Sequence, residues 1–210
     1  MDPKPLEDFL PDLNILVDGV PRVFMLGALR QTCIEFCQQT LLLREKLAIL
    51  PISANVDEYE LEPSLCDSEV CRVLNVWVNG TLISPTTPDI GVRAAGLYQS
   101  DLPSAYYCTE PSVLRLVPMP TAAAVLEVEV AYAPASDADN VPMALYTMHR
   151  EDIVRGAAAR LLIMPKRPWT DMTAGKVYRN LFWHHMHSVA RSDHWSGYGR
   201  PVHVASSKFL

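Results

Sequence analysis

Residues 140–191 read NVPMALYTMHREDIVRGAAARLLIMPKRPWTDMTAGKVYRNLFWHHMHSVAR and predict two α-helices joined by a short link. Apolar side chains recur at three- and four-residue steps as far as Met164, and again beyond the link Pro165-Lys166-Arg167-Pro168, whose prolines end the first helix. A link this short favours an antiparallel pair. The small residues at 156–159 allow another backbone to come close.

A third helix is predicted upstream, over residues 21–44. It has an apolar stripe that is wide enough to be buried on more than one side. The stripe includes Val23, Leu26, Cys33, Cys37 and Leu41. The first twenty residues instead carry prolines at positions 3, 5 and 11, and they predict an extended arm that ends in a turn.

Between these helices, residues 45–135 show the two-residue alternation of β-strands. The clearest element is a hairpin. Its first strand, 70–78, leads into Asn79-Gly80, the dipeptide that best tolerates the positive φ angles of a type I′ turn, and the chain returns through 81–83. A later strand, 125–132, alternates apolar and acidic residues, so one face is expected to meet a core and the other water or a partner.

This order of elements predicts an α+β fold. We expect a helical bundle, made of one long N-terminal helix and a C-terminal antiparallel helix pair, with an inserted antiparallel β-sheet and extended N- and C-terminal arms. We expect a single domain over residues 1–191, with its helical part at 21–44 and 140–191 and its β insertion at 45–135. Residues 192–210 are irregular but rich in aromatic residues, and they predict an extended C-terminal docking tail.

The composition argues against several classes of protein. The net charge of −6 gives no global basic field for binding nucleic acid. Apolar stretches end well before the roughly 18 residues of a transmembrane helix, and the acidic, proline-rich start MDPKPLEDFLPDLN is unlike a secretory signal. Five cysteines, an odd number, do not suggest a disulfide framework. We therefore expect a protein that is made and kept in a cytoplasm.

No motif predicts a catalytic, cofactor or metal site. The cluster His184-His185-x-His187 lacks the further ligands of a zinc site, and His185 falls on the apolar stripe of its helix, where we expect a hydrogen-bonded, half-buried side chain. Cys33 and Cys37 lie four residues apart on an apolar helix face and are expected to be buried thiols. Nucleophile-elbow and glycine-rich phosphate motifs are absent from the sequence. The protein is therefore expected not to be an enzyme.

Basic side chains concentrate around the last two helices. Three roles are open for them: solubility and helix C-termini, contact with the acidic surface of another subunit, or contact with phosphate. These residues are Lys166, Arg167, Lys176, Arg179 and Arg191.

The chain resembles the podovirus-type head-to-tail adaptors of tailed bacteriophages, also called head completion or tail tubular proteins. The resemblance covers residues 10–191 and rests on the first helix, the hairpin and the last two helices with their link. The matching residues are Gly27-Ala28-Leu29-Arg30, Ile34-Glu35-Phe36-Cys37, Val76-Trp77-Val78-Asn79-Gly80, 157–164 and Pro165-Lys166-Arg167-Pro168-Trp169-Thr170-Asp171. These are mostly core and turn residues, which define a fold rather than a chemistry.

The resemblance implies a virion structural protein in the neck, assembled in the host cytoplasm. Related adaptors form a homo-oligomeric ring of twelve copies between the portal protein and the tail or nozzle protein, and DNA passes through its channel during genome ejection without being read. Their C-terminal segment reaches the portal, which gives candidate contacts with the portal or a neighbouring subunit. These contacts are Trp195, Tyr198, Val202, Val204, Phe209 and Leu210.

Three alternatives stay open. The tail can instead pack back on its own helices. The chain can be another neck or tail-completion protein, although its large β insertion favours the podovirus type. It can also be a cell-wall hydrolase, for which Glu58 and Glu110 are the only candidate carboxylates.

Overall fold

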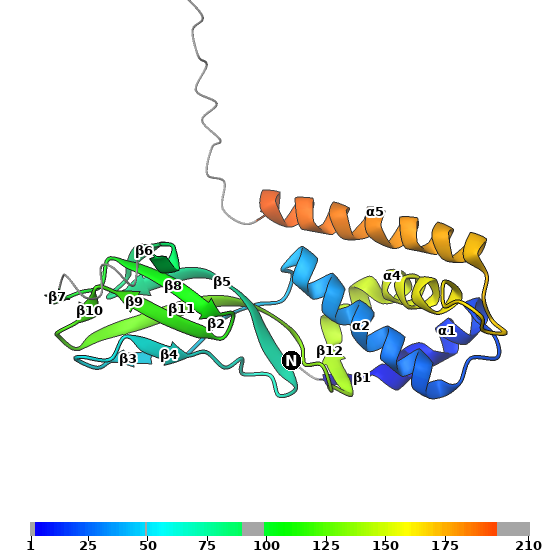
Figure 1. Cartoon of the computed structure of the whole chain (residues 1–210), viewed down its shortest axis with the longest axis horizontal. Helices are drawn as coiled ribbons and strands as arrows, with labels where there is room; N and C mark the ends of the chain where they lie inside the picture. Colours follow the sequence, from blue (N-terminus) through cyan, green and yellow to red (C-terminus); the bar gives the residue numbers. More distant parts are fainter. Residues whose placement is uncertain (1–2, 49, 90–98, 197–210) are drawn as a thin grey trace, which may run out of the picture.

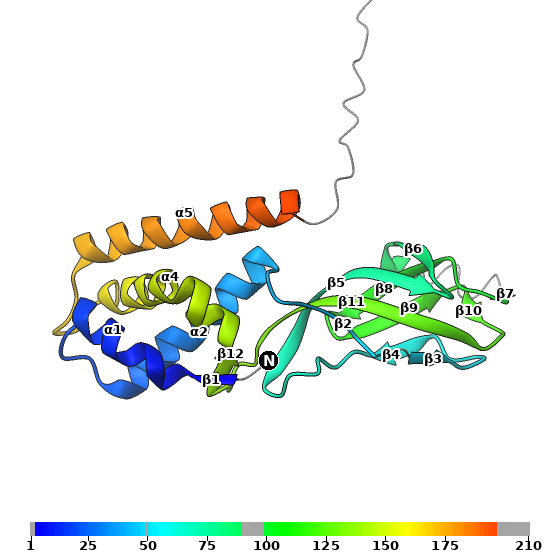
Figure 2. The same ribbon diagram turned by 180° about the vertical axis from the view of Figure 1, so that it is seen from behind.

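The computed structural model describes residues 3–48, 50–89 and 99–196 and shows a helical part beside a large curled β-sheet (Figures 1 and 2). The helical part contains four α-helices and one 3₁₀ helix in the described residues. They are η1 (Leu6–Phe9), α1 (Leu10–Leu16), α2 (Arg22–Thr40), α4 (Met143–Leu162) and α5 (Met172–Ser196). None of the helices in the described ranges is long and apolar enough to cross a membrane.

The sheet contains eight strands in the described residues. They are β2 (Arg44–Lys46), β3 (Leu50–Ile52), β4 (Glu58–Glu60), β5 (Ser68–Val78), β6 (Thr81–Pro85), β8 (Ala105–Glu110), β9 (Val113–Val117) and β11 (Ala124–Pro134). Their order is β2-β11-β5-β6-β8-β9-β4, and β3 also pairs with β11. Two small sheets accompany this one. They are β1 (Pro3–Pro5) with β12 (Asn140–Pro142), and β7 (Gln99–Ser100) with β10 (Met119–Pro120).

The predicted hairpin is confirmed. Strand β5 turns into β6 through Asn79 and Gly80, whose φ angles are 49° and 76°. Val78 pairs directly with Thr81 across this two-residue turn. Both φ angles lie in the left-handed region that a type I′ turn requires, which asparagine and glycine adopt more easily than other residues.

The predicted architecture is wrong. The chain is not a helical bundle with a minor antiparallel insertion, because its sheet is mixed and has a hydrophobic core of its own. Strands β6 and β8 run parallel, whereas the strands of a hairpin run antiparallel. The fully buried Val76, Leu116 and Leu126 belong to the sheet core.

The predicted extended N-terminal arm is also wrong. Strand β1 pairs with β12, and the chain then enters η1 and α1. The side chains of Leu6, Phe9 and Leu13 are at most 1% exposed and belong to the helical core. Pro11 does not prevent this, because it lies in the first turn of α1, where its missing N–H has no helical partner to lose.

Strand β11 takes part in both hydrophobic cores. Its residues Leu126, Val128 and Val130 lie in the core of the sheet, whereas Tyr132 and Ala133 lie in the helical core. Strand β5 pairs with β11 from one core to the other, from Leu126 to Pro134. The two parts of the molecule therefore share one pair of strands, whose register shifts between Glu129 and Val130 and again between Ala131 and Tyr132.

Candidate interaction surfaces

Helix α5 packs closely on α4 because two glycines leave room for it. A Cβ atom at Gly156 of α4 would lie 2.6 Å from Cγ2 of Thr32 and 2.9 Å from Cδ2 of Phe182. A Cβ atom at Gly175 of α5 would lie 2.8 Å from Cγ1 of Ile163. The close approach expected at residues 156–159 is thus present, and it leaves α5 with one buried face and two flanks.

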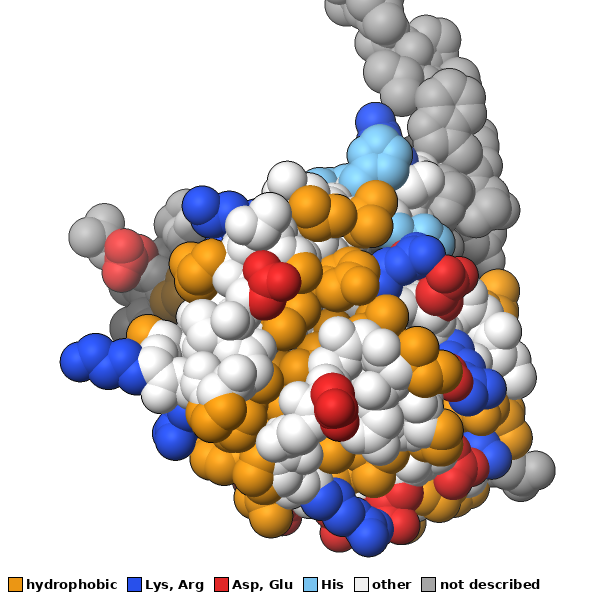
Figure 3. Space-filling model, turned by 90° about the vertical axis from the view of Figure 1, so that its right-hand side faces the viewer, with side chains coloured by type: hydrophobic (Ala, Val, Ile, Leu, Met, Phe, Trp, Pro, Cys, Tyr) orange, Lys and Arg blue, Asp and Glu red, His pale blue; other side chains and the backbone are white. Residues whose placement is uncertain are grey.

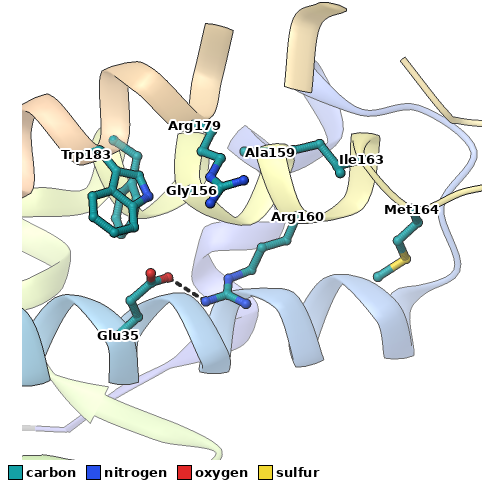
Figure 4. A pocket seen from close by; sticks show the side chains of 9 residues that line it. Glu35, Gly156, Ala159, Arg160, Ile163, Met164, Arg179 and Trp183 are labelled. Atoms are coloured by element: carbon teal, nitrogen blue, oxygen red, sulfur yellow. Dashed lines mark hydrogen bonds and ion pairs between the residues drawn. The ribbon is translucent and has the colours of Figure 1, made fainter. Parts of the chain in front are cut away.

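A pocket of about 380 Å³ opens on one flank of α5, where this helix meets α2 and α4 (Figure 4). Arg179 and Trp183 reach it from α5, and Arg160 reaches it from α4. Arg160 is paired with Glu35 of α2. The remaining lining residues are Gly156, Ala159, Ile163, Met164 and Phe182. The pocket therefore combines an apolar lining with two guanidinium groups, only one of which has its charge balanced inside the pocket.

A larger groove, of about 700 Å³, lies on the other flank of α5, where α1, α4 and α5 meet. It presents large apolar side chains to solvent: Ile15 is 81% exposed, Met148 69% and Leu181 44%. The ion pairs along this groove are Arg150–Asp12 and Arg155–Glu151. An apolar groove whose neighbouring charges are already paired is suited to contact with another protein surface.

The end of the helical part, where α1 leads into α2 and α4 into α5, is also rich in apolar side chains (Figure 3). Val23, at the start of α2, is 79% exposed. The rings of Phe24 and Trp169 lie 5.9 Å apart, and the guanidinium group of Arg167 lies 5.3 Å from the centre of the Phe24 ring. The predicted basic link is thus part of an aromatic cluster.

Two histidines and an aspartate connect α4 with α5. Nδ1 of the buried His149 lies 3.2 Å from Nε2 of His185, which in turn lies 3.2 Å from Oδ2 of Asp152. Burial lowers the pKa of His149 and the neighbouring His185 lowers it further, whereas Asp152 acts in the opposite direction. His185 is therefore hydrogen-bonded and half-buried, as predicted. In the part of the chain that is described, no three His, Cys, Asp or Glu side chains are placed to hold a metal ion.

The thiols of Cys33 and Cys37 are fully buried in the helical core, as predicted. Burial raises the pKa of Cys33 to about 12 and also raises the pKa of Cys37. Cys66 is exposed. These differences make Cys33 and Cys37 structural groups rather than reactive ones.

The candidate tail contacts lie almost entirely outside the described residues. Helix α5 continues to Ser196, past the boundary predicted at Arg191, so the backbone of Trp195 is helical while its side chain lies outside the description. The other candidates outside the described residues are Tyr198, Val202, Val204, Phe209 and Leu210.

The two candidate hydrolase carboxylates lie on exposed strand positions. Glu58 of β4 is paired with Arg115 of β9, and Glu110 ends β8. Strand β9 lies between β4 and β8 in the sheet, so the two carboxylates occupy strands that do not pair with each other.

The sequence alone did not identify Ile15, Met148 or the pocket around Trp183. Ile15 falls in the segment that the sequence predicts to be an extended arm, so no helix face, buried or exposed, was predicted for it. Met148 follows the spacing of buried helix residues, so no local signal marks it as exposed. Glu35 and Arg160 are 125 residues apart and meet only in the folded chain.

A search of curated proteins found no match to this chain. A family model described as SU10 adaptor protein matches residues 6–205, which includes both the helical part and the sheet. The match extends over nearly the whole chain and agrees with the resemblance carried by the first helix, the hairpin and the last two helices. The chain therefore belongs to the SU10 adaptor protein family, whose members are structural proteins of the phage neck that join head to tail through contacts with other head and tail proteins.

Proposed function

We propose that this adaptor forms a ring, with twelve copies as in related adaptors, between the portal and the tail or nozzle protein. The observation that carries the proposal is the amount of apolar surface left open on the helical part. Ile15, Val23 and Met148 are each more than two-thirds exposed, and they lie on α1, α2 and α4. Ile15 and Met148 line the same groove. Apolar surface left open in this way is usually covered in the functional assembly, and a repeated contact around an axis covers it in every copy.

The ring would leave a channel for DNA during genome ejection. Residues 43–135, which supply the sheet, contain twelve acidic and five basic residues. If this acidic region lines the channel, it repels the phosphate groups of DNA, and the DNA passes without adhering. We therefore propose non-specific proximity to DNA and no sequence recognition.

The C-terminal tail would contact the portal or a neighbouring subunit through Trp195, Tyr198 and the apolar residues that follow. Helix α5 supports this role because it continues through the first residues of the predicted tail, as far as Ser196, and so connects the tail rigidly to the helical part. We propose that residues 1–191 act as one adaptor domain from which the tail extends. The sharing of β11 between the two cores supports a single unit.

The test is size-exclusion chromatography with light scattering on the purified full-length protein, alone and mixed with the portal protein from the same genome. A second variant ends at Ser196, which retains all of α5. We expect a portal-dependent shift of the full-length protein to a large complex, and loss of that shift in the truncated variant. The portal of an unrelated phage is the control and is expected to give no shift.

The outcomes separate the parts of this proposal. Binding of the truncated variant at full strength would remove the docking role of residues 197–210 but keep the adaptor role. No association of either form with the portal would favour another position in the neck. We propose no catalytic role, and digestion of cell-wall material by the purified protein would contradict this.

A further inference from the structure

The flank of α5 that faces α2 has a positive charge that the described residues do not balance. Arg179 projects from α5 into the 380 Å³ pocket beside Trp183, and among the described residues no carboxylate is paired with it. Arg160 shares the pocket but already binds Glu35. A guanidinium group beside an indole ring and an apolar lining is suited to a carboxylate from a protein surface, because it offers parallel N–H donors and the lining can cover part of the incoming group.

The distribution of charge along the chain indicates where such a carboxylate is available. Residues 153–191, which include the second half of α4 and most of α5, contain seven basic residues and one acidic residue. The sheet region, 43–135, has the opposite balance, with twelve acidic and five basic residues. Copies of this chain therefore attract one another when the helical flank of one copy approaches the sheet of the next.

Within the sheet, the edge formed by β4 is the most suitable acidic element. Strand β4 is the last strand in the order of the sheet, so its outer edge is not covered by a further strand in the described residues. Glu60 and Glu62 are both exposed, and they flank Leu61, which is buried. Glu58 of the same strand is already paired with Arg115, whereas no basic side chain of the described residues is paired with Glu60 or Glu62.

The positions of the two surfaces exclude a contact within one molecule. Figures 1 and 2 both place α5 along one long side of the molecule and β4 along the opposite side. Complementary surfaces on opposite sides produce a head-to-tail contact that repeats from copy to copy, and such a contact closes into a ring when the rotation allows it.

We propose that the pocket formed by Arg160, Arg179 and Trp183 in one copy receives the acidic edge, Glu60 and Glu62, of a second copy. This inference rests on the proposed ring and names the surfaces that build it. Arg179 supplies the charge that pairs with the incoming carboxylate. Trp183 and the apolar lining exclude water around this pair, which strengthens it relative to an exposed ion pair.

The experiment uses full-length protein in sedimentation velocity, alone and with the portal protein of the same genome. One variant, Arg179→Glu, has a defective pocket and an intact edge. The other, Glu60→Lys with Glu62→Lys, has an intact pocket and a defective edge. Arg72→Glu is the matched control, because it reverses one exposed arginine within the acidic sheet. Circular dichroism establishes that each variant is folded.

We expect the wild type and Arg72→Glu to assemble, and each of the two interface variants to need a roughly tenfold or higher protein concentration for the same degree of assembly. An equimolar mixture of the two interface variants should assemble, because the unchanged edge of one fits the unchanged pocket of the other, and the reversed edge and reversed pocket also carry opposite charges. A chain that carries all three substitutions should assemble again, because the charges of the pair are exchanged.

Three results would overturn the inference. Assembly of Arg179→Glu at the wild-type concentration would exclude this pocket while leaving the proposed ring intact. If Arg179→Glu assembles normally but no longer retards duplex DNA in a gel-shift assay in which the wild type does, the pocket would instead be a binding site for DNA phosphate groups. A wild type that stays monomeric both alone and with the portal would contradict the proposed function, and with it the contact.

Discussion

The Nδ1 atom of His149 on α4 lies 3.2 Å from the Nε2 atom of His185 on α5, so two imidazole rings join the last two helices. A proton on both rings would place two positive charges next to each other in a partly buried site. The pKa of His149 is accordingly lowered from its ordinary value of 6.5 by burial and by His185. The junction between α4 and α5 is therefore sensitive to acid.

The stability of the protein should fall as the pH decreases below about 6.5. The unfolded chain takes up the proton of His149 near its ordinary pKa, whereas the folded chain takes it up only at a lower pH, so acid favours the unfolded state. The free energy of unfolding of His149→Gln should decrease less than that of the wild type between about pH 7 and about pH 5. His184→Gln, at an exposed position of α5, is the control and should follow the wild type. Equal pH slopes for wild type and His149→Gln would contradict this role.

Substitution of Phe9 should show that the N-terminal segment belongs to the core. Phe9 is fully buried and makes an edge-on contact with Tyr146, with ring centres 5.0 Å apart. Phe9→Ala should lower the free energy of unfolding by about 3–5 kcal/mol in urea denaturation. Ile15→Ala removes an apolar side chain that is 81% exposed, and it should change stability by no more than about 0.5 kcal/mol. Similar effects of both substitutions would argue for a loosely attached segment.

Two glycine substitutions should have opposite effects on the melting temperature. Gly156→Ala should lower stability by about 1–3 kcal/mol, because the new methyl group would overlap with Thr32 and Phe182. Gly27→Ala, in the interior of α2, has no atom within 4 Å of its new methyl group. It should raise stability by about 0.5–1 kcal/mol through its better helix propensity. A stabilising effect at Gly156 would show that α4 and α5 are not closely packed.

Alkylation should distinguish the cysteines by burial. Cys66 is exposed and should react first with iodoacetamide, whereas Cys33 and Cys37 should react only after unfolding. The pKa of about 12 at Cys33 means that very little of its thiolate exists near neutral pH. Peptide mass spectrometry after a timed reaction gives the order directly. Early modification of Cys33 in the native protein would contradict the packing of α2.

Features that depend on nearby residues could be predicted from the sequence. The hairpin follows from Asn79-Gly80 between two alternating strands, and the helix pair follows from its apolar spacing and the prolines of the link. The buried state of Cys33 and Cys37 follows from their positions on one helix face. In each case the residues that decide the structure lie within a few positions of one another.

Features that depend on distant residues could not be predicted in this way. The parallel pairing of β6 with β8 joins two strands that are separated in the sequence by residues 86–104, where no hydrophobic period is present. Leu6, Phe9 and Leu13 do recur at helical steps, but the prolines around them favoured an extended segment. The basic residues of α5 could be named from the sequence as candidates for subunit contact. Their pocket could not, because it needs Glu35 and Arg160 from two other helices.

The course of β11 through both cores has a mechanical consequence. Any load applied to the sheet, for example when a tail is pulled, is carried to the helical part along β11, which pairs with β5 from Leu126 to Pro134, and along the chain that joins α2 to β2. When β11 is pulled along its own axis, the force is shared by the hydrogen bonds between β11 and β5, which must break together rather than one after another. The sheet and the helical part should therefore resist bending relative to each other more than two domains joined by a single flexible linker would.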